Sequence, residues 1–238
     1  MNVLTRLWDH VYASQPAPPA WVVGVTALAA LLLVLNTASW RLAGKVITIA
    51  HEGGHALVSV LSGRRLEGIR LHTDSSGVTY SRGKRRGPGL VLTAAAGYVT
   101  PPLLGAGAAA LLAARHPAAL LWLALVLLAA TFLAVRNAFG ALAVLVTAAG
   151  VFAVSYYASA AVQGGFAYLA AWFLLLGGIR PALELTRRRS VSRSGSRSGL
   201  SDADQLARLT GVSRGVWVTA FVLVATAALA LGTRLLVP

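Results

Sequence analysis

The chain has 238 residues, of which 57% are hydrophobic and only 12% are charged, and its mean hydropathy is +0.70. One globule of this length cannot bury so much apolar surface, so the composition excludes a soluble globular protein and predicts an all-α polytopic membrane protein. The formal net charge of +14 does not point to a nucleic-acid partner, because the basic residues lie in short segments that flank apolar spans.

The first part of the chain is expected to form an N-terminal segment followed by two apolar spans. Residues 1–19 place apolar side chains at helical spacing between charged ones and then become rich in proline, which favours an interfacial segment and a stiff linker. A first apolar span is expected at 20–35. A second is expected at about 40–61, and its middle contains the most informative motif of the sequence.

That motif is His51-Glu52-Gly53-Gly54-His55. Two histidines four residues apart share one face of a helix, so both can bind one Zn²⁺, while the glutamate between them can act as general base on an attacking water. The bland alternative is a polar interruption of a membrane helix, but ionisable groups in hydrocarbon are costly and are rarely kept without a role. Because the chain has no cysteine, any metal must be held by histidine and carboxylate.

Residues 64–86 carry the β signal of the sequence. Apolar and β-branched residues lie on both sides of the Asp/Ser/Gly cluster at 73–77, and a basic run ends the segment. This pattern predicts a small β-hairpin. Its edge could receive a substrate segment by strand addition.

The rest of the chain is mainly apolar and predicts five more spans, which makes about seven. They are expected at about 90–113, 118–135, 138–158, 166–185 and 215–236. We therefore divide the chain into a membrane-embedded core at 20–185, a basic Ser/Arg linker at 186–200, and a last unit at 201–238. This last unit should contain a short cytoplasmic helix and the final span.

Basic residues gather on one side of the expected spans, which indicates the orientation. With seven spans, the basic residues expected on the opposite side are Arg41, Lys45, Arg115 and Arg234. The hairpin and the Ser/Arg linker are therefore placed in the cytoplasm. The linker has no aromatic residues among its charges, so it is expected to contact anionic lipid headgroups and not nucleic acid.

Several segments together carry a family resemblance. They are 50–57, 61–72, 77–79, 96–101, 136–140 and 201–207, with Trp217 further on. The sequence resembles the M50 site-2-protease metallopeptidases and, more narrowly, the M50B-like group common in actinobacteria, so a bacterial cell membrane is the expected location. The resemblance implies cleavage of transmembrane substrates inside the bilayer, with His51 and His55 as zinc ligands, Glu52 as the base and a distant aspartate as third ligand. The Leu-Asp-Gly signature that supplies this aspartate in better-known site-2 proteases is missing.

Three acidic residues on the cytoplasmic side remain candidates for the third ligand: Glu184, Asp202 and Asp204. Asp202 matches the M50B-like pattern and is the preferred candidate. Each residue also has a structural explanation. An acid in the first turn of a helix, such as Asp202, interacts favourably with the helix dipole, Asp204 suits a helix cap, and Glu184 can pair with neighbouring arginines.

The sequence therefore predicts an intramembrane zinc endopeptidase acting on transmembrane protein substrates. The alternative keeps the fold without the chemistry, as a membrane scaffold or metal-binding regulator. Glu52 discriminates between them, because a binding-only site needs no general base. Asn137 could polarise a scissile carbonyl or cap a helix. Neither the substrate's identity nor the oligomeric state follows from the sequence.

Overall fold

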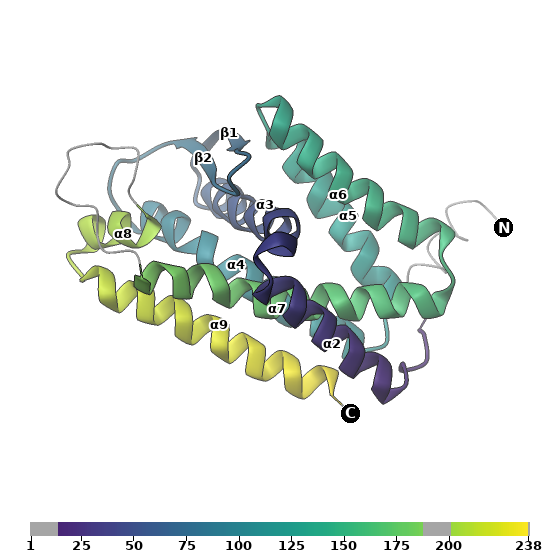
Figure 1. Cartoon of the computed structure of the whole chain (residues 1–238). Coiled ribbons are helices and arrows are strands. Elements are labelled where there is room, and N and C mark those ends of the chain that lie inside the picture. Colours follow the sequence, from purple (N-terminus) through teal and green to yellow (C-terminus); the bar gives the residue numbers. More distant parts are fainter. Residues whose placement is uncertain (1–13, 188–200, 238) are drawn as a thin grey trace.

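The computed structural model describes residues 14–187 and 201–237. Over these residues the chain is mainly helical, with one two-stranded hairpin, and most of its long helices run side by side (Figure 1). In chain order the elements are α2 (Ala20–Leu35), α3 (Thr37–Leu61), β1 (Arg65–Leu71), β2 (Gly77–Arg82), α4 (Pro88–Ala113), α5 (Pro117–Ala134), α6 (Ala138–Tyr157), α7 (Ala160–Arg187), α8 (Asp202–Thr210) and α9 (Arg214–Leu236). Most of the expected interfacial segment and of the Ser/Arg linker lies outside the described residues.

Five helices, α4, α5, α6, α7 and α9, are long and apolar enough to cross a membrane, so the chain is an integral multi-pass membrane protein. Helices α2 and α3 meet the same criterion only as a pair, and they meet at a bend of 101°. The described residues thus provide five spans, or six if the pair counts as one, and not the expected seven. Helix α2 has 16 residues and reaches only about 24 Å across a hydrocarbon core of about 30 Å, while α3 carries the polar motif.

Two side chains determine the bend between α2 and α3. Asn36 is extended, and its side-chain oxygen accepts hydrogen bonds from the backbone N–H groups of Ala38 and Ser39, which starts a new helix. The guanidinium of Arg180 in α7 donates to the carbonyl of Val34 and lies 4.6 Å from the ring centroid of Trp40. Arg180 therefore contacts both sides of the bend, so α3 turns away from α2 where a straight span would have continued.

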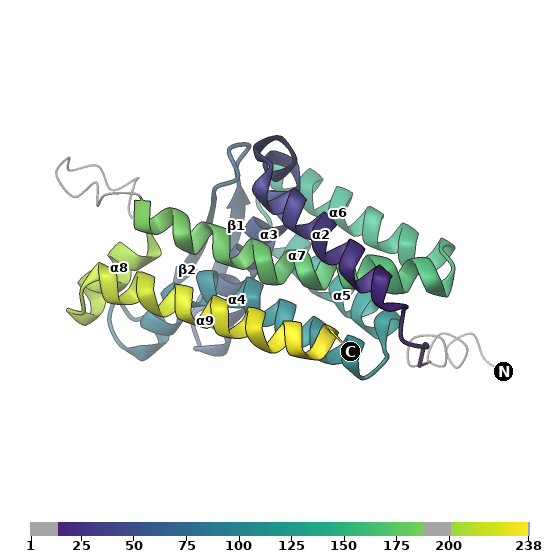
Figure 2. The ribbon, with the colours of Figure 1, turned by 60° about the horizontal axis from the view of Figure 1, so that its bottom comes forward.

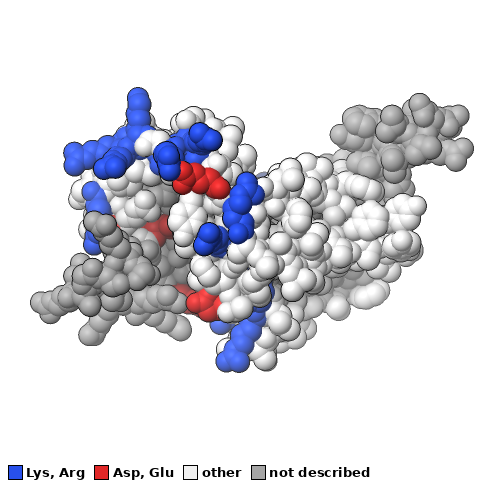
Figure 3. Space-filling view, turned by 90° about the horizontal axis from the view of Figure 1, so that it is seen from above, with Lys and Arg blue, Asp and Glu red and all other residues white. Residues whose placement is uncertain are grey.

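This bend changes the expected placement of Lys45. Its ammonium group donates to the carbonyl of Thr73 in the hairpin turn at 2.9 Å, so Lys45 lies beside the hairpin and not across the membrane from it. The start of α2 lies at the other end of the molecule, where the N–H of Gln15 donates to the carbonyl of Arg115 after α4. Basic side chains gather at the hairpin end (Figure 3). Lys45 thus joins the basic side chains at that end.

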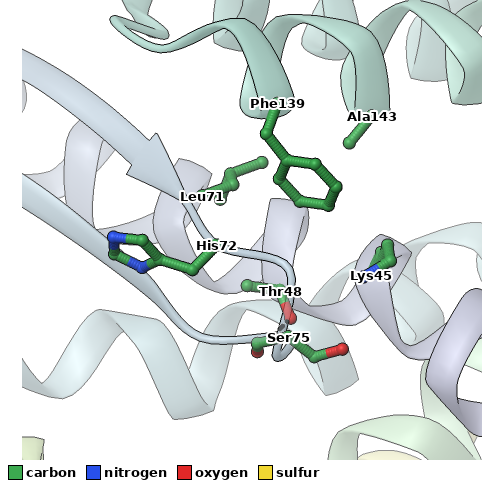
Figure 4. A pocket seen from close by; sticks show the side chains of 7 residues that line it. All are labelled: Lys45, Thr48, Leu71, His72, Ser75, Phe139 and Ala143. Carbon is green, nitrogen blue, oxygen red and sulfur yellow. Dashed lines mark hydrogen bonds between the residues drawn. The ribbon is translucent and has the colours of Figure 1, made fainter.

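The hairpin turn is held against α3 and α6 around a small cavity of about 10 Å³ (Figure 4). The hydroxyl of Thr48 donates to the carbonyl of Ser75 at 2.9 Å. The ammonium group of Lys45 also lies 5.0 Å from the ring centroid of Phe139 in α6. These contacts join the turn to α3, the helix that carries the motif at residues 51–55.

The hairpin confirms the β prediction. The edge of β1 that faces away from β2 is also paired. Strands β1 and β2 are antiparallel, and β1 also forms a parallel bridge between Ile69 and Val135. The side-chain amide of Asn137 donates to the carbonyl of Leu71 at 2.8 Å, and its oxygen accepts from the N–H of Leu71 at 3.2 Å. Asn137 makes no side-chain cap to α6. It acts here as an extra backbone-like partner of β1, which neither sequence interpretation anticipated.

The helical core is built around α4 and α7. In Figure 2, α5 and α6 lie together on one side of this pair and α9 on another. At the hairpin end, Ala203 and Leu206 of α8 are fully buried in a cluster with Leu185, Val218 and Phe221. This hydrophobic cluster fixes the short helix α8 against α7 and α9. It thereby places the first turn of α8 beside the motif of α3.

Candidate metal centre

Three side chains, from α3 and α8, meet in one small triangle. The Nε2 atoms of His51 and His55 are 3.1 Å apart, and Oδ2 of Asp202 lies 3.1 Å from the first and 3.2 Å from the second. Tetrahedral zinc with ligand distances of about 2.0–2.1 Å requires ligand atoms about 3.3 Å apart. The spacing, the burial and the donor set, two imidazoles and one carboxylate, therefore fit a zinc ion.

The hydrogen bond of His55 orients its imidazole for this purpose. Its Nδ1 lies 2.6 Å from the carbonyl oxygen of Thr93 in α4, and a carbonyl can only accept. Nδ1 must therefore carry the proton, which leaves the lone pair of Nε2 free for a metal. The ring of His51 is packed edge-on against Tyr98 with centroids 4.8 Å apart, and Tyr98 stacks on Phe221. Both imidazoles are thus held by groups on α4 and α9.

Gly97 of α4 lets the helix backbone approach the two ligand nitrogens. A Cβ at position 97 would lie 2.4 Å from Nε2 of His55 and 2.5 Å from Nε2 of His51. Real Cβ atoms do not approach nitrogen so closely, whereas a zinc ion binds at about 2.0–2.1 Å. A side chain at position 97 would therefore push the two ligand nitrogens out of place, and glycine avoids this. Sequence reasoning included Gly97 in the family resemblance but gave it no role.

Of the three acidic candidates, the structure brings only Asp202 to the histidines. Asp204 completes a capping box with Ser201 and lies 3.2 Å from Nε of Arg214, so it fixes the start of α8. Glu184 pairs with Arg180 in α7 at 3.1 Å, and its side chain is 44% exposed. Asp204 therefore caps a helix and Glu184 forms an ion pair, as their structural explanations from the sequence predicted.

The charge of the site is balanced around Asp202. Burial raises the pKa of this carboxyl, but hydrogen bonds and charge interactions with His51 and His55 outweigh burial and hold its pKa well below the usual range. Asp202 is therefore ionised, as a metal ligand must be.

Glu52 lies between the two histidines in sequence but outside the triangle. Its side chain is 3% exposed, and its carboxylate accepts a hydrogen bond of 2.7 Å from the hydroxyl of Thr79 in β2. The group of potential ligands comprises His51, His55 and Asp202 without Glu52. Glu52 is thus available for proton transfer, which is the role the motif predicts.

The site opens into a cleft of about 1500 Å³ between α3, β2, α4, α7 and α8. This volume exceeds the roughly 300–1,000 Å³ of small-molecule pockets. The lining includes all three triangle residues, Glu52, and residues Gly77 to Ser81 of β2. The cleft is therefore large enough for a polypeptide segment that lies along β2 and passes the triangle.

A sequence model of the Peptidase M50B-like family matches residues 24–232. This match covers the motif, the hairpin, α8 and nearly all of α9, so the chain belongs to the M50B-like peptidase family. No curated protein and no solved structure matches the chain.

Proposed function

From membership of this zinc-dependent membrane metallopeptidase family, we propose that the protein is an intramembrane zinc endopeptidase that cuts transmembrane protein substrates within the bilayer. The observation that carries the proposal is the triangle of His51, His55 and Asp202 beside a buried glutamate that does not belong to it. A metal-binding scaffold would need the triangle but would have no use for a buried base held next to it.

In this mechanism the triangle holds the metal and Glu52 moves the proton. A bound zinc supplies Lewis acidity, which polarises the scissile carbonyl and makes water a stronger nucleophile. Glu52 accepts the proton of the attacking water and returns it to the leaving amine. The hydrogen bond from His55 to the carbonyl of Thr93 keeps the imidazole oriented throughout. The surrounding helices limit the access of bulk water to the bond being cut.

The substrate is proposed to bind as an extended segment along β2. One edge of this strand pairs with β1, and the strand lines the cleft. Strand addition would satisfy the backbone of a transmembrane segment that has lost its helical hydrogen bonds. A substrate with a helix that unwinds easily in the leaflet near the hairpin would therefore be cut best.

The orientation is also part of the proposal. The hairpin segment carries Arg64, Arg65, Lys84, Arg85 and Arg86. We place this end in the cytoplasm of a bacterial cell, of the actinobacterial type, against anionic headgroups. With the bent pair α2 and α3 as one span, the chain crosses six times. Both ends of the chain would then lie on the far side.

The test is to compare cells that carry the wild type, Glu52→Gln or Glu67→Gln. Glu52→Gln removes the proton acceptor but leaves the triangle intact, so zinc content should stay the same while cleavage falls by about 10²–10⁴-fold. Glu67 pairs with Arg82 on the exposed side of the hairpin and serves as the matched control. Membrane proteomics should find membrane-anchored fragments with the wild type and Glu67→Gln that are absent with Glu52→Gln.

The opposite result would favour the scaffold. In that case no fragment depends on Glu52, and Glu52→Gln rescues the phenotype of a strain that lacks the whole protein. The peptidase proposal would then be wrong, whatever the zinc content.

A further inference from the structure

The carboxylate of Glu52 is held by strand β2. The hydroxyl of Thr79 lies 2.7 Å from Oε2 of Glu52 and 3.1 Å from its backbone carbonyl oxygen. A hydrogen bond to an ionised carboxylate is about twice as strong as one between neutral groups. Thr79 therefore ties the base to the hairpin, although the two residues are 27 positions apart in the chain.

Gly77 closes the other side of the same carboxylate. A Cβ at position 77 would lie 2.6 Å from Cγ and 2.7 Å from Oε1 of Glu52. The backbone of β2 thus packs directly on the glutamate, and only glycine permits this approach. Oε2 of Glu52 accepts a hydrogen bond from Thr79, and Oε1 packs closely against the backbone of Gly77. The side chain of Glu52 therefore has little freedom to rotate away.

The strand that makes these contacts is itself anchored. Thr79 is paired with Ile69 and Gly77 with Leu71, and both partners in β1 are buried. Ile69 is bridged to Val135, and α3 holds the hairpin turn through hydrogen bonds from its own side chains. The hydroxyl of Thr79 is therefore presented to Glu52 from a fixed position.

We propose that Thr79 is a positioning residue for the general base, and that β2 therefore belongs to the hydrolytic machinery as well as to the substrate cleft. This inference rests on the proposed peptidase function. A general base must lie within hydrogen-bonding reach of the water it activates, and a displacement of about 1 Å can reduce the rate about 10²-fold. The hydroxyl of Thr79 provides this placement without contacting the metal ligands.

The test compares Thr79→Val, which keeps the shape and removes the hydroxyl, with Thr79→Ser, which keeps the hydroxyl. The probe is the purified parent protein of a fragment that depends on Glu52. Thr79→Val should lower kcat about 10–100-fold, with KM and zinc content unchanged, and Thr79→Ser should recover most of kcat. The control is Thr147→Val in α6, where the lost hydroxyl bonds only to the carbonyl of Ala143 in its own helix; its kcat should match the wild type.

A double-mutant cycle separates positioning from a general structural effect. In the Glu52→Gln background, Thr79→Val should cause no further loss, because the group it positions is already inactive. Wild-type kcat in Thr79→Val, or equal losses in Thr79→Val and Thr79→Ser, would overturn the positioning role while leaving the peptidase proposal intact. Cleavage of the same purified protein by Glu52→Gln at the wild-type rate would show that the dependence seen in cells is indirect, and it would overturn the peptidase proposal and the positioning role with it.

Discussion

Gly97→Ala tests the metal centre without changing any ligand. The added Cβ would lie 2.4–2.5 Å from both Nε2 atoms, and ordinary contact begins at 3.4 Å, so each nitrogen would have to retreat by about 1 Å. Metal–ligand distances tolerate only about 0.2 Å. At least one imidazole should therefore be lost as a ligand. We predict a loss of about 100-fold or more in zinc affinity, which corresponds to about 2.8 kcal/mol.

The same substitution should leave the metal-free fold in place. The atoms in the way belong to two side chains and not to backbone, and alanine is favoured over glycine in a helix by about 1 kcal/mol. Gly107→Ala on the same helix is the matched control, because a Cβ there meets nothing within 4 Å. Zinc affinity is measured on metal-stripped protein in detergent by competition with a chromophoric chelator. Zinc binding by Gly97→Ala with wild-type affinity would refute the close approach of α4 to the two ligand nitrogens.

Two further predictions concern the third ligand and the span count. Asp202→Ala should remove most of the zinc from the purified protein, whereas Glu184→Ala should retain it, because the carboxylate of Glu184 pairs with Arg180 and not with the histidines. Equal retention by the two variants would contradict the proposed triangle. A reporter inserted after Arg86 should face the cytoplasm, while reporters at His116 and at the N-terminus should both face the opposite side. An N-terminal reporter in the cytoplasm would instead restore the seventh span.

The parts of the site that depend on local periodicity could be predicted from the sequence. His51, Glu52 and His55 lie within two helical turns, so their spacing alone brings the histidines to one face. Asp202 is 147 residues from His55, and no local pattern spans that separation. It was preferred because it matches a family pattern, while its position on the cytoplasmic side was shared with Glu184 and Asp204.

The roles of Gly97 and Thr79 could not be predicted because they depend on how separate elements cross. A glycine in an apolar helix is usually a packing residue, and its contact with two imidazoles appears only when α4 lies against α3.

The bend between α2 and α3 could not be predicted either, because hydropathy identifies apolar segments but carries no information on their direction. The asparagine at position 36 is a recognisable helix start, but Arg180, which holds the bend, lies in α7, so α2 and α3 read as two full spans.

The separation of the ligands along the chain also affects how the protein is made. His51 is synthesised 151 residues before Asp202, which at about 5–20 residues per second is an interval of roughly 8–30 s. During that interval the nascent chain contains the motif and the hairpin but lacks a complete ligand set. On the proposed function, a newly made molecule is inert while its helices insert, and it acquires hydrolytic capacity only when α8, almost the last element to be translated, docks beside α3.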